Sequence, residues 1–172
     1  MKHRIFILSV VTAALIIFGC GQEGLVSPQL TQSEQGTVLA KATRTSFTAT
    51  VPLQTVTNPG VTTVTPGGVV QVRGQAITGQ ISGGITGTLN LVNNVNIVQA
   101  TGKGPGYGSF TIATAGGNWS GRFDGQNVGP VFSGHFTGQG SAGLAGTIQG
   151  TFTDAANPLF NVFVLTGTII TP

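Results

Sequence analysis

Trp119-Ser-Gly-Arg-Phe123 and Phe132-Ser-Gly-His-Phe136 are two copies of a five-residue pattern that occurs six times in this chain: large apolar, polar, glycine, polar, large apolar. The other copies are Ile77–Ile81, Ile85–Leu89, Ile148–Phe152 and Leu165–Ile169. Successive side chains of a β-strand point to opposite faces, so each copy places two large residues and the glycine on one face. A glycine inside a strand costs stability, and its repeated use indicates a notch for a neighbouring side chain or a bend. The pattern predicts a curved, closed or doubled antiparallel sheet.

The composition around these copies predicts an all-β domain. From Ser46 onward Thr, Val, Gly and Asn dominate, and no stretch has the apolar period of a helix. Turn residues separate short candidate strands, which favours a small antiparallel β-barrel, with a β-sandwich as the alternative. The expected strands are 47–56, 61–64, 69–72, 77–81, 85–92, 95–98, 109–114, 118–123, 131–137, 147–153 and 159–170.

Alternation alone does not decide which face of the sheet meets water. In a membrane barrel the apolar face would meet lipid. Most of the expected strands span no more than about seven residues, whereas a membrane strand needs about nine to eleven. No paired aromatic girdles are present either, and we therefore favour a barrel outside the membrane.

The N-terminus resembles a bacterial lipoprotein signal. Lys2 and Arg4 precede an unbroken apolar run, Ile5–Phe18, and the run ends before Cys20, the only cysteine in the chain. The resemblance implies a signal peptide over residues 1–19, a lipidated Cys20 bearing palmitate-type acyl chains, a flexible tether over 20–45, and a barrel domain over 46–172. The alternative is an uncleaved anchor in which Cys20 is an ordinary thiol.

The residue after the cysteine bears on the expected location. Gly21 stands where an Asp would resemble an inner-membrane retention signal. We therefore expect a lipid-anchored protein of the cell envelope, on the outer membrane and facing the periplasm or the surface. Through this lipid anchor, the membrane is an expected partner of the chain.

The charge pattern argues against a nucleic-acid partner. The formal net charge is +3, and without Lys2 and Arg4 the chain keeps five basic and four acidic residues. A net charge of +1 gives no basic patch for a phosphate backbone. One histidine outside the signal and no glutamate after Glu34 also give no recognisable metal or cofactor site.

Two sets of side chains are candidates for a site. Five aromatic residues could line a pocket for an apolar ligand or simply form the core: Tyr107, Trp119, Phe123, Phe132 and Phe136. His135, with Asp124 or Asp154 and a serine, has the residue types of a hydrolase triad. The repeat places His135 at a polar position, which favours a surface histidine, so we assign no catalytic residue.

The stretch from Gly102 to Thr153 resembles the second half of the allene oxide cyclase and dirigent barrels. The resemblance rests on Trp119–Phe123 and on the glycines of Gly138-Gln-Gly-Ser-Ala-Gly-Leu-Ala-Gly146. It implies an eight-stranded calycin-like barrel. It also implies a pocket carboxylate or paired Asp and Arg, and this domain offers only Asp124 and Asp154 as acids.

Three functions follow as hypotheses. The first is a non-catalytic module that binds a small apolar ligand or an envelope protein, because no acid–base constellation is visible. The second is a cyclase-like or dirigent-like isomerase that uses Asp124, Arg122 or Tyr107 inside a cavity. The third is a structural or adhesive envelope protein that uses exposed strand edges.

Overall fold

The computed structural model describes residues 41–52, 54–157 and 160–172 of the 172-residue chain. These residues belong to one compact unit, Leu39–Pro172. The expected signal peptide, Cys20 and most of the expected tether lie outside the described residues. Within the described ranges there is no helix long and apolar enough to cross a membrane.

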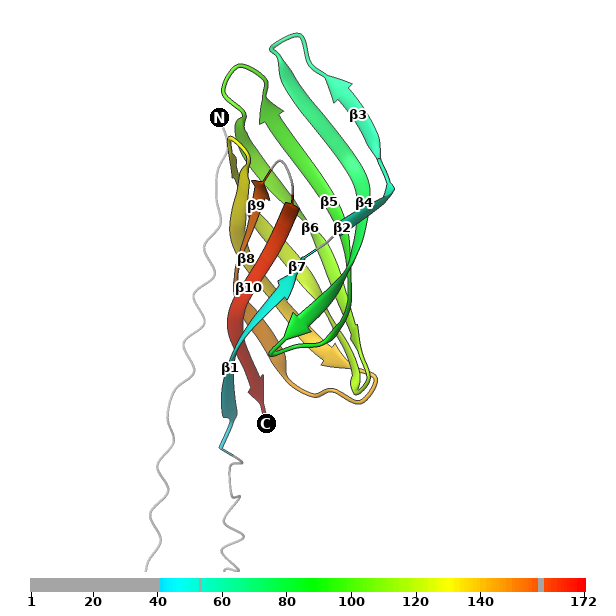
Figure 1. Ribbon diagram of the computed structural model, residues 1–172, viewed down its shortest axis with the longest axis vertical. Helices are drawn as coiled ribbons and strands as arrows, with labels where there is room; N and C mark the ends of the chain where they lie inside the picture. The colour runs from blue at the N-terminus through cyan, green and yellow to red at the C-terminus, as the bar shows by residue number, and fades with distance from the viewer. Residues whose placement is uncertain (1–40, 53, 158–159) are drawn as a thin grey trace, which may run out of the picture. The chain divides into compact units, whose positions relative to one another are not determined.

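The described chain forms one antiparallel sheet of ten strands (Figure 1). The strands are β1 (Thr43–Val51), β2 (Gln54–Asn58), β3 (Val61–Val64), β4 (Val69–Gly83), β5 (Gly87–Val98), β6 (Lys103–Thr114), β7 (Gly117–Val128), β8 (Val131–Ser141), β9 (Thr147–Asn157) and β10 (Phe160–Thr171). The prediction of an all-β fold is confirmed.

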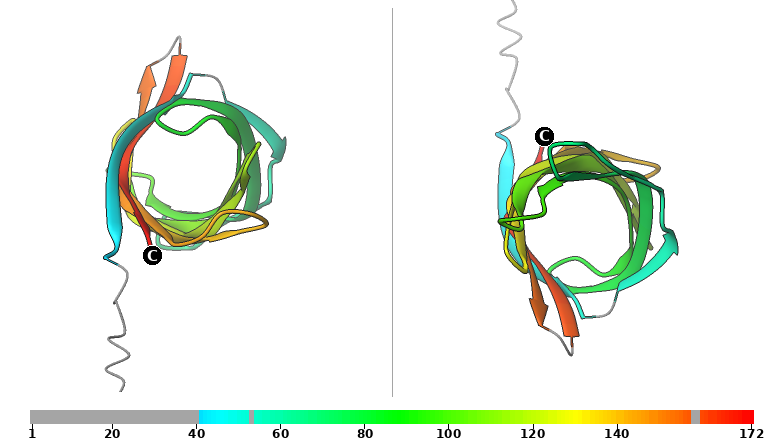
Figure 2. Two further views of the ribbon diagram at one scale, coloured as in Figure 1. Left: turned by 90° about the horizontal axis from the view of Figure 1, so that it is seen from below. Right: turned by 90° about the horizontal axis from the view of Figure 1, so that it is seen from above.

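Eight of these strands close into a ring. The strands from β4 to β10 each pair with the next, and β10 pairs with β1 from Thr171 to Phe163. β1 then meets β4 through Ala49 opposite Gly83 and Thr50 opposite Ser82. The strands surround a common axis in both end views (Figure 2). The sheet is therefore the expected antiparallel barrel.

The ring is incomplete at one end. β1 leaves β10 at Val51, and Pro52, which has no N–H to donate, follows at once. β2 and β3 then run along β4 and pair with no other described strand. We call this the open end. The opposite end of the barrel holds Thr43, where β1 begins beside Thr171.

The repeated pattern faces inward with its large residues and glycines. Phe123 and Phe136 are buried, whereas Arg122 and His135, which alternate with them, are exposed. Closing the sheet removes this apolar face from water, which explains why the pattern favours a closed sheet. The outer wall is polar along these strands, the reverse of a wall that faces lipid.

The predicted strand lengths are wrong. β4 joins two expected strands across a bulge between Val72 and Gln75, and β6 to β9 extend into stretches that were expected to be loops. Glycine-rich segments that resemble turns are paired strands here, as Gly106 opposite Gly125 shows. The argument from short strands against a membrane barrel therefore no longer holds. The argument now rests on the apolar face of the sheet, which points into the barrel and not outward.

Candidate functional site

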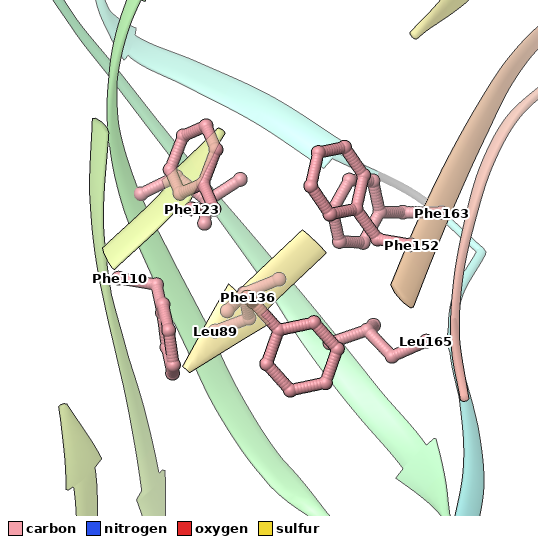
Figure 3. Close-up of a pocket in the computed structure, with 8 residues that line it drawn as sticks. Leu89, Phe110, Phe123, Phe136, Phe152, Phe163 and Leu165 are labelled. Carbon is pink, nitrogen blue, oxygen red and sulfur yellow. The ribbon is translucent and has the colours of Figure 1, made fainter. Parts of the chain in front are cut away.

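The barrel interior is filled by aromatic rings. Phe152 stacks on Phe163 with ring centroids 5.3 Å apart, and its centroid lies 5.0 Å from that of Phe132 and 5.8 Å from that of Phe123. Figure 3 shows Phe123, Phe152 and Phe163 of this group pointing into the interior from different strands. Trp119 and Phe136 are also buried. Four of the five aromatic residues proposed from the sequence therefore face the interior.

The strand glycines make room for these rings. A Cβ added to Gly108 would lie 2.7 Å from Phe123 Cζ, and one added to Gly106 would lie 2.8 Å from Phe132 Cζ. Real Cβ contacts are not this short, so each ring occupies the space that a side chain would need. The notch is thus one role of the strand glycines. At Gly121 and Gly134 of the repeat, an added Cβ would instead meet a backbone oxygen of the neighbouring strand, so close approach of two strands is the other.

The interior leaves little room for a ligand. The cavity at its centre measures about 10 Å³ and is lined by Leu89, Leu91, Phe110, Phe123, Phe136, Phe152, Phe163 and Leu165. A cavity of about this size holds one water molecule. These aromatic residues act as core, which was the alternative to a pocket.

Tyr107 does not join this cluster. It is 46% exposed and lies on the outer wall, opposite Asp124 of β7. Asp124 in turn lies opposite His135 of β8. Arg122 is exposed on the same wall. The groups that the isomerase hypothesis requires inside a cavity are thus all outside it.

The outer wall around His135 is a shallow polar groove. Its volume is about 440 Å³, and Asp124, Gln126, Ser133, His135, Thr151 and Thr153 contribute to its lining. Among the described residues, His135 makes no side-chain hydrogen bond to a serine or to Asp124. The arrangement of a hydrolase triad is not formed there. The described residues also contain no group of three His, Cys, Asp or Glu side chains that could hold a metal ion.

The open end holds polar side chains on the inner face. Among the described residues, three buried side-chain atoms have no hydrogen-bond partner: Gln54 Nε2, Asn93 Oδ1 and Asp154 Oδ1. A buried polar atom without a partner costs about 1–3 kcal/mol. These atoms are therefore candidates for contact with a ligand.

Asp154 is the charged member of this set. It lies between Phe132 of β8 and Phe163 of β10 in the strand register. Burial raises the pKa of its carboxyl group, and the nearby Gln54 amide offsets part of that shift. Neither group reaches hydrogen-bond geometry with the other. The carboxylate is thus held in an apolar surrounding without a compensating charge.

The outer edge of β2 and β3 is the second unusual feature of the open end. Val56, Val61 and Val64, on these two neighbouring strands, are 52%, 66% and 57% exposed. No charged residue occurs between Thr45 and Val72. Natural edge strands usually carry charges that discourage pairing. Short strands and Pro59 blunt this edge, but no charge does.

Sequence reasoning expected exposed strand edges without locating them at β2 and β3, and it missed the inward position of Asp154. Asp154 follows Phe152 by two residues, so the alternation that places Phe152 inside also places Asp154 inside. That signal was available. The position of Gln54 beside Asp154 depends on ring closure between distant strands and had no local signal.

Comparison of the chain with protein-family models, with curated proteins and with solved structures gives no match. The resemblance to allene oxide cyclase and dirigent barrels therefore stays a prediction from the sequence.

Proposed function

We propose that this chain is a lipid-anchored protein of the cell envelope whose barrel binds a protein partner without catalysis. The observation that carries the proposal is the uncharged edge of β2 and β3 with its exposed valines. An extended segment can add to such an edge, because the backbone supplies hydrogen bonds and alternate side chains find pockets.

The filled interior favours a protein over a small apolar ligand. A cavity of about 10 Å³ has no room for a lipid or a similar guest. Exposed apolar side chains at the edge instead offer area that a partner can cover. The outward position of Asp124, Arg122 and Tyr107 gives the isomerase alternative no support.

The proposed anchor fits the position of the edge. β1 begins at Thr43, at the end of the barrel opposite β3, so the chain that precedes the domain joins it away from the open end. With Cys20 acylated, the edge would be free to meet a partner, and the outer membrane is the expected location.

A photocrosslinking amino acid at Thr63, which is exposed on β3, tests the proposal in intact cells. We expect one discrete adduct with another envelope protein, and none from the same amino acid at Gln139, exposed on β8. Val61→Lys should abolish the adduct without changing the melting temperature, because a charge blocks strand addition.

The identity of the adduct separates the hypotheses. A dimer of this chain would instead favour the structural or adhesive alternative. No adduct, or an adduct that Val61→Lys leaves intact, would overturn the proposal.

A further inference from the structure

The open end holds a carboxylate that lacks a cation. Of the two acidic side chains among the described residues, Asp124 is exposed and Asp154 is half-buried. Its Oδ1 atom is buried without a partner. Phe132 and Phe163 flank it on the neighbouring strands.

We propose that Asp154, together with Gln54 and the rings of Phe132 and Phe163, binds an alkylammonium group. The carboxylate supplies the opposite charge and accepts hydrogen bonds from the N–H groups. The faces of aromatic rings attract a cation within about 6 Å of their centroids. Gln54 can turn its amide over and present its oxygen as a second acceptor.

The chain does not supply this cation from its own described residues. Arg73 is the basic residue of β4. Its guanidinium group already donates hydrogen bonds to the carbonyls of Val72 and Val95 and to Asn96 Oδ1. Lys103 and Arg122 are exposed. The raised pKa of Asp154 reflects burial with no compensating charge, and a bound ammonium would lower the pKa again.

A metal ion fits this site less well than an organic cation. Calcium takes six or more oxygen ligands, and magnesium needs a nearly ideal octahedron. The site offers one carboxylate and one amide among phenyl rings. A weakly hydrated ammonium on an alkyl stem matches this mixture of charge and apolar surface.

The ammonium could belong to a free amine or to a lysine of the partner. We favour the lysine, and in this respect the inference rests on the proposed function. Gln54 lies on β2, the same strand that offers the open edge. A strand added beside β2 would direct alternate side chains toward the interior, where a lysine could reach Asp154.

The test uses the full chain in non-ionic detergent micelles, titrated with three probes and followed by NMR of the phenylalanine rings. The probes are butylammonium chloride, the peptide acetyl-Thr-Val-Lys-Val-Thr-amide, and the same peptide with norleucine in place of lysine. Asp154→Asn is compared with Asp124→Asn, which changes an exposed carboxylate on the outer wall.

We expect butylammonium to bind with a dissociation constant on the order of millimolar. Asp154→Asn should weaken this binding about tenfold or more, because it removes the only opposite charge, and Asp124→Asn should not. If the lysine peptide binds about tenfold more tightly than both butylammonium and the norleucine peptide, the site is assigned to a lysine of the partner. Equal binding of the lysine peptide and butylammonium would assign it to a free amine.

Failure of every probe to bind, or binding that Asp154→Asn leaves unchanged, would overturn the ammonium site. The Thr63 adduct distinguishes this failure from failure of the proposed function. If Asp154→Asn keeps the adduct while no probe binds, the edge still binds a partner and only the ammonium site is wrong.

Discussion

Phe136 of β8 lies opposite Gly150 of β9, and its ring fills the space above the glycine: a Cβ added to Gly150 would lie 2.9 Å from Phe136 Cζ. The same Cβ would lie 2.6 Å from the Cα atom of Gly167, which faces Gly150 from β10. The added methyl group would thus meet both a core ring and the backbone of the next strand.

Gly150→Ala is therefore expected to destabilise the barrel by about 1–3 kcal/mol or more, the usual cost of overpacking a core. Gly116→Ala is the matched control, because the nearest atom to a Cβ there lies 3.6 Å away. It should change the free energy of unfolding by less than about 0.5 kcal/mol. Urea denaturation of both variants gives the comparison, and equal losses would show that the ring and the glycine do not share this space.

The role of the aromatic cluster as core gives a second prediction. Phe152→Ala should cost about 3–5 kcal/mol, because Phe152 packs against three other rings and its removal leaves a cavity. Tyr107→Ala, on the outer wall, should stay within about 0.5 kcal/mol. The measurement is the free energy of unfolding in urea. A large loss for Tyr107→Ala would place Tyr107 in the core instead.

The sequence predicted which side of each repeat faces the interior, but not how far the strands run. Phe132-Ser-Gly-His-Phe136 gives its two faces by alternation alone. The segment Lys103–Gly108 has one large side chain, Tyr107, and that side chain points outward, so nothing local marks a strand. Its glycines are explained only by residues of other strands: a Cβ added to Gly106 would meet the ring of Phe132, and one added to Gly104 would meet the backbone of Asn96.

The open end was less predictable because it depends on ring closure. Val51 pairs with Phe163, more than a hundred residues later, and that pairing places Gln54 near Asp154. Pro52, which has no N–H to donate, lies where the chain changes partner from β10 to β4. A local pattern can mark such a break without saying which strand comes next.

Lipidation of Cys20 is a prediction from the sequence that chemical analysis can test directly. The wild-type chain should incorporate labelled palmitate and begin at an acylated Cys20 when its N-terminus is analysed by mass spectrometry. Cys20→Ala should lose the label and accumulate as a precursor that still carries residues 1–19, because signal removal depends on the modified thiol. Unlabelled wild-type protein that retains residues 1–19 would instead favour the uncleaved anchor with an ordinary thiol.

The buried carboxylate of Asp154 gives a prediction about pH. Burial raises its pKa in the folded chain above the ordinary value, so the unfolded chain releases this proton at lower pH than the folded chain does. The group therefore costs no stability when the pH is below its unfolded pKa. It destabilises the fold as the pH rises from that value through the folded pKa, and the cost persists at neutral pH.

Asp154→Asn removes this cost, since the amide is neutral at every pH. Its melting temperature should exceed that of the wild type by roughly 2–4 °C at pH 7, the shift that about 1 kcal/mol produces in a chain of this size, after discounting for the partial exposure of the group. At pH 3 the two melting temperatures should coincide. Asp124→Asn, on the exposed outer wall, should shift the melting temperature by less than this at pH 7. A stabilising effect of Asp154→Asn that is equal at pH 3 and pH 7 would mean that packing of the amide, and not the carboxylate charge, accounts for the gain.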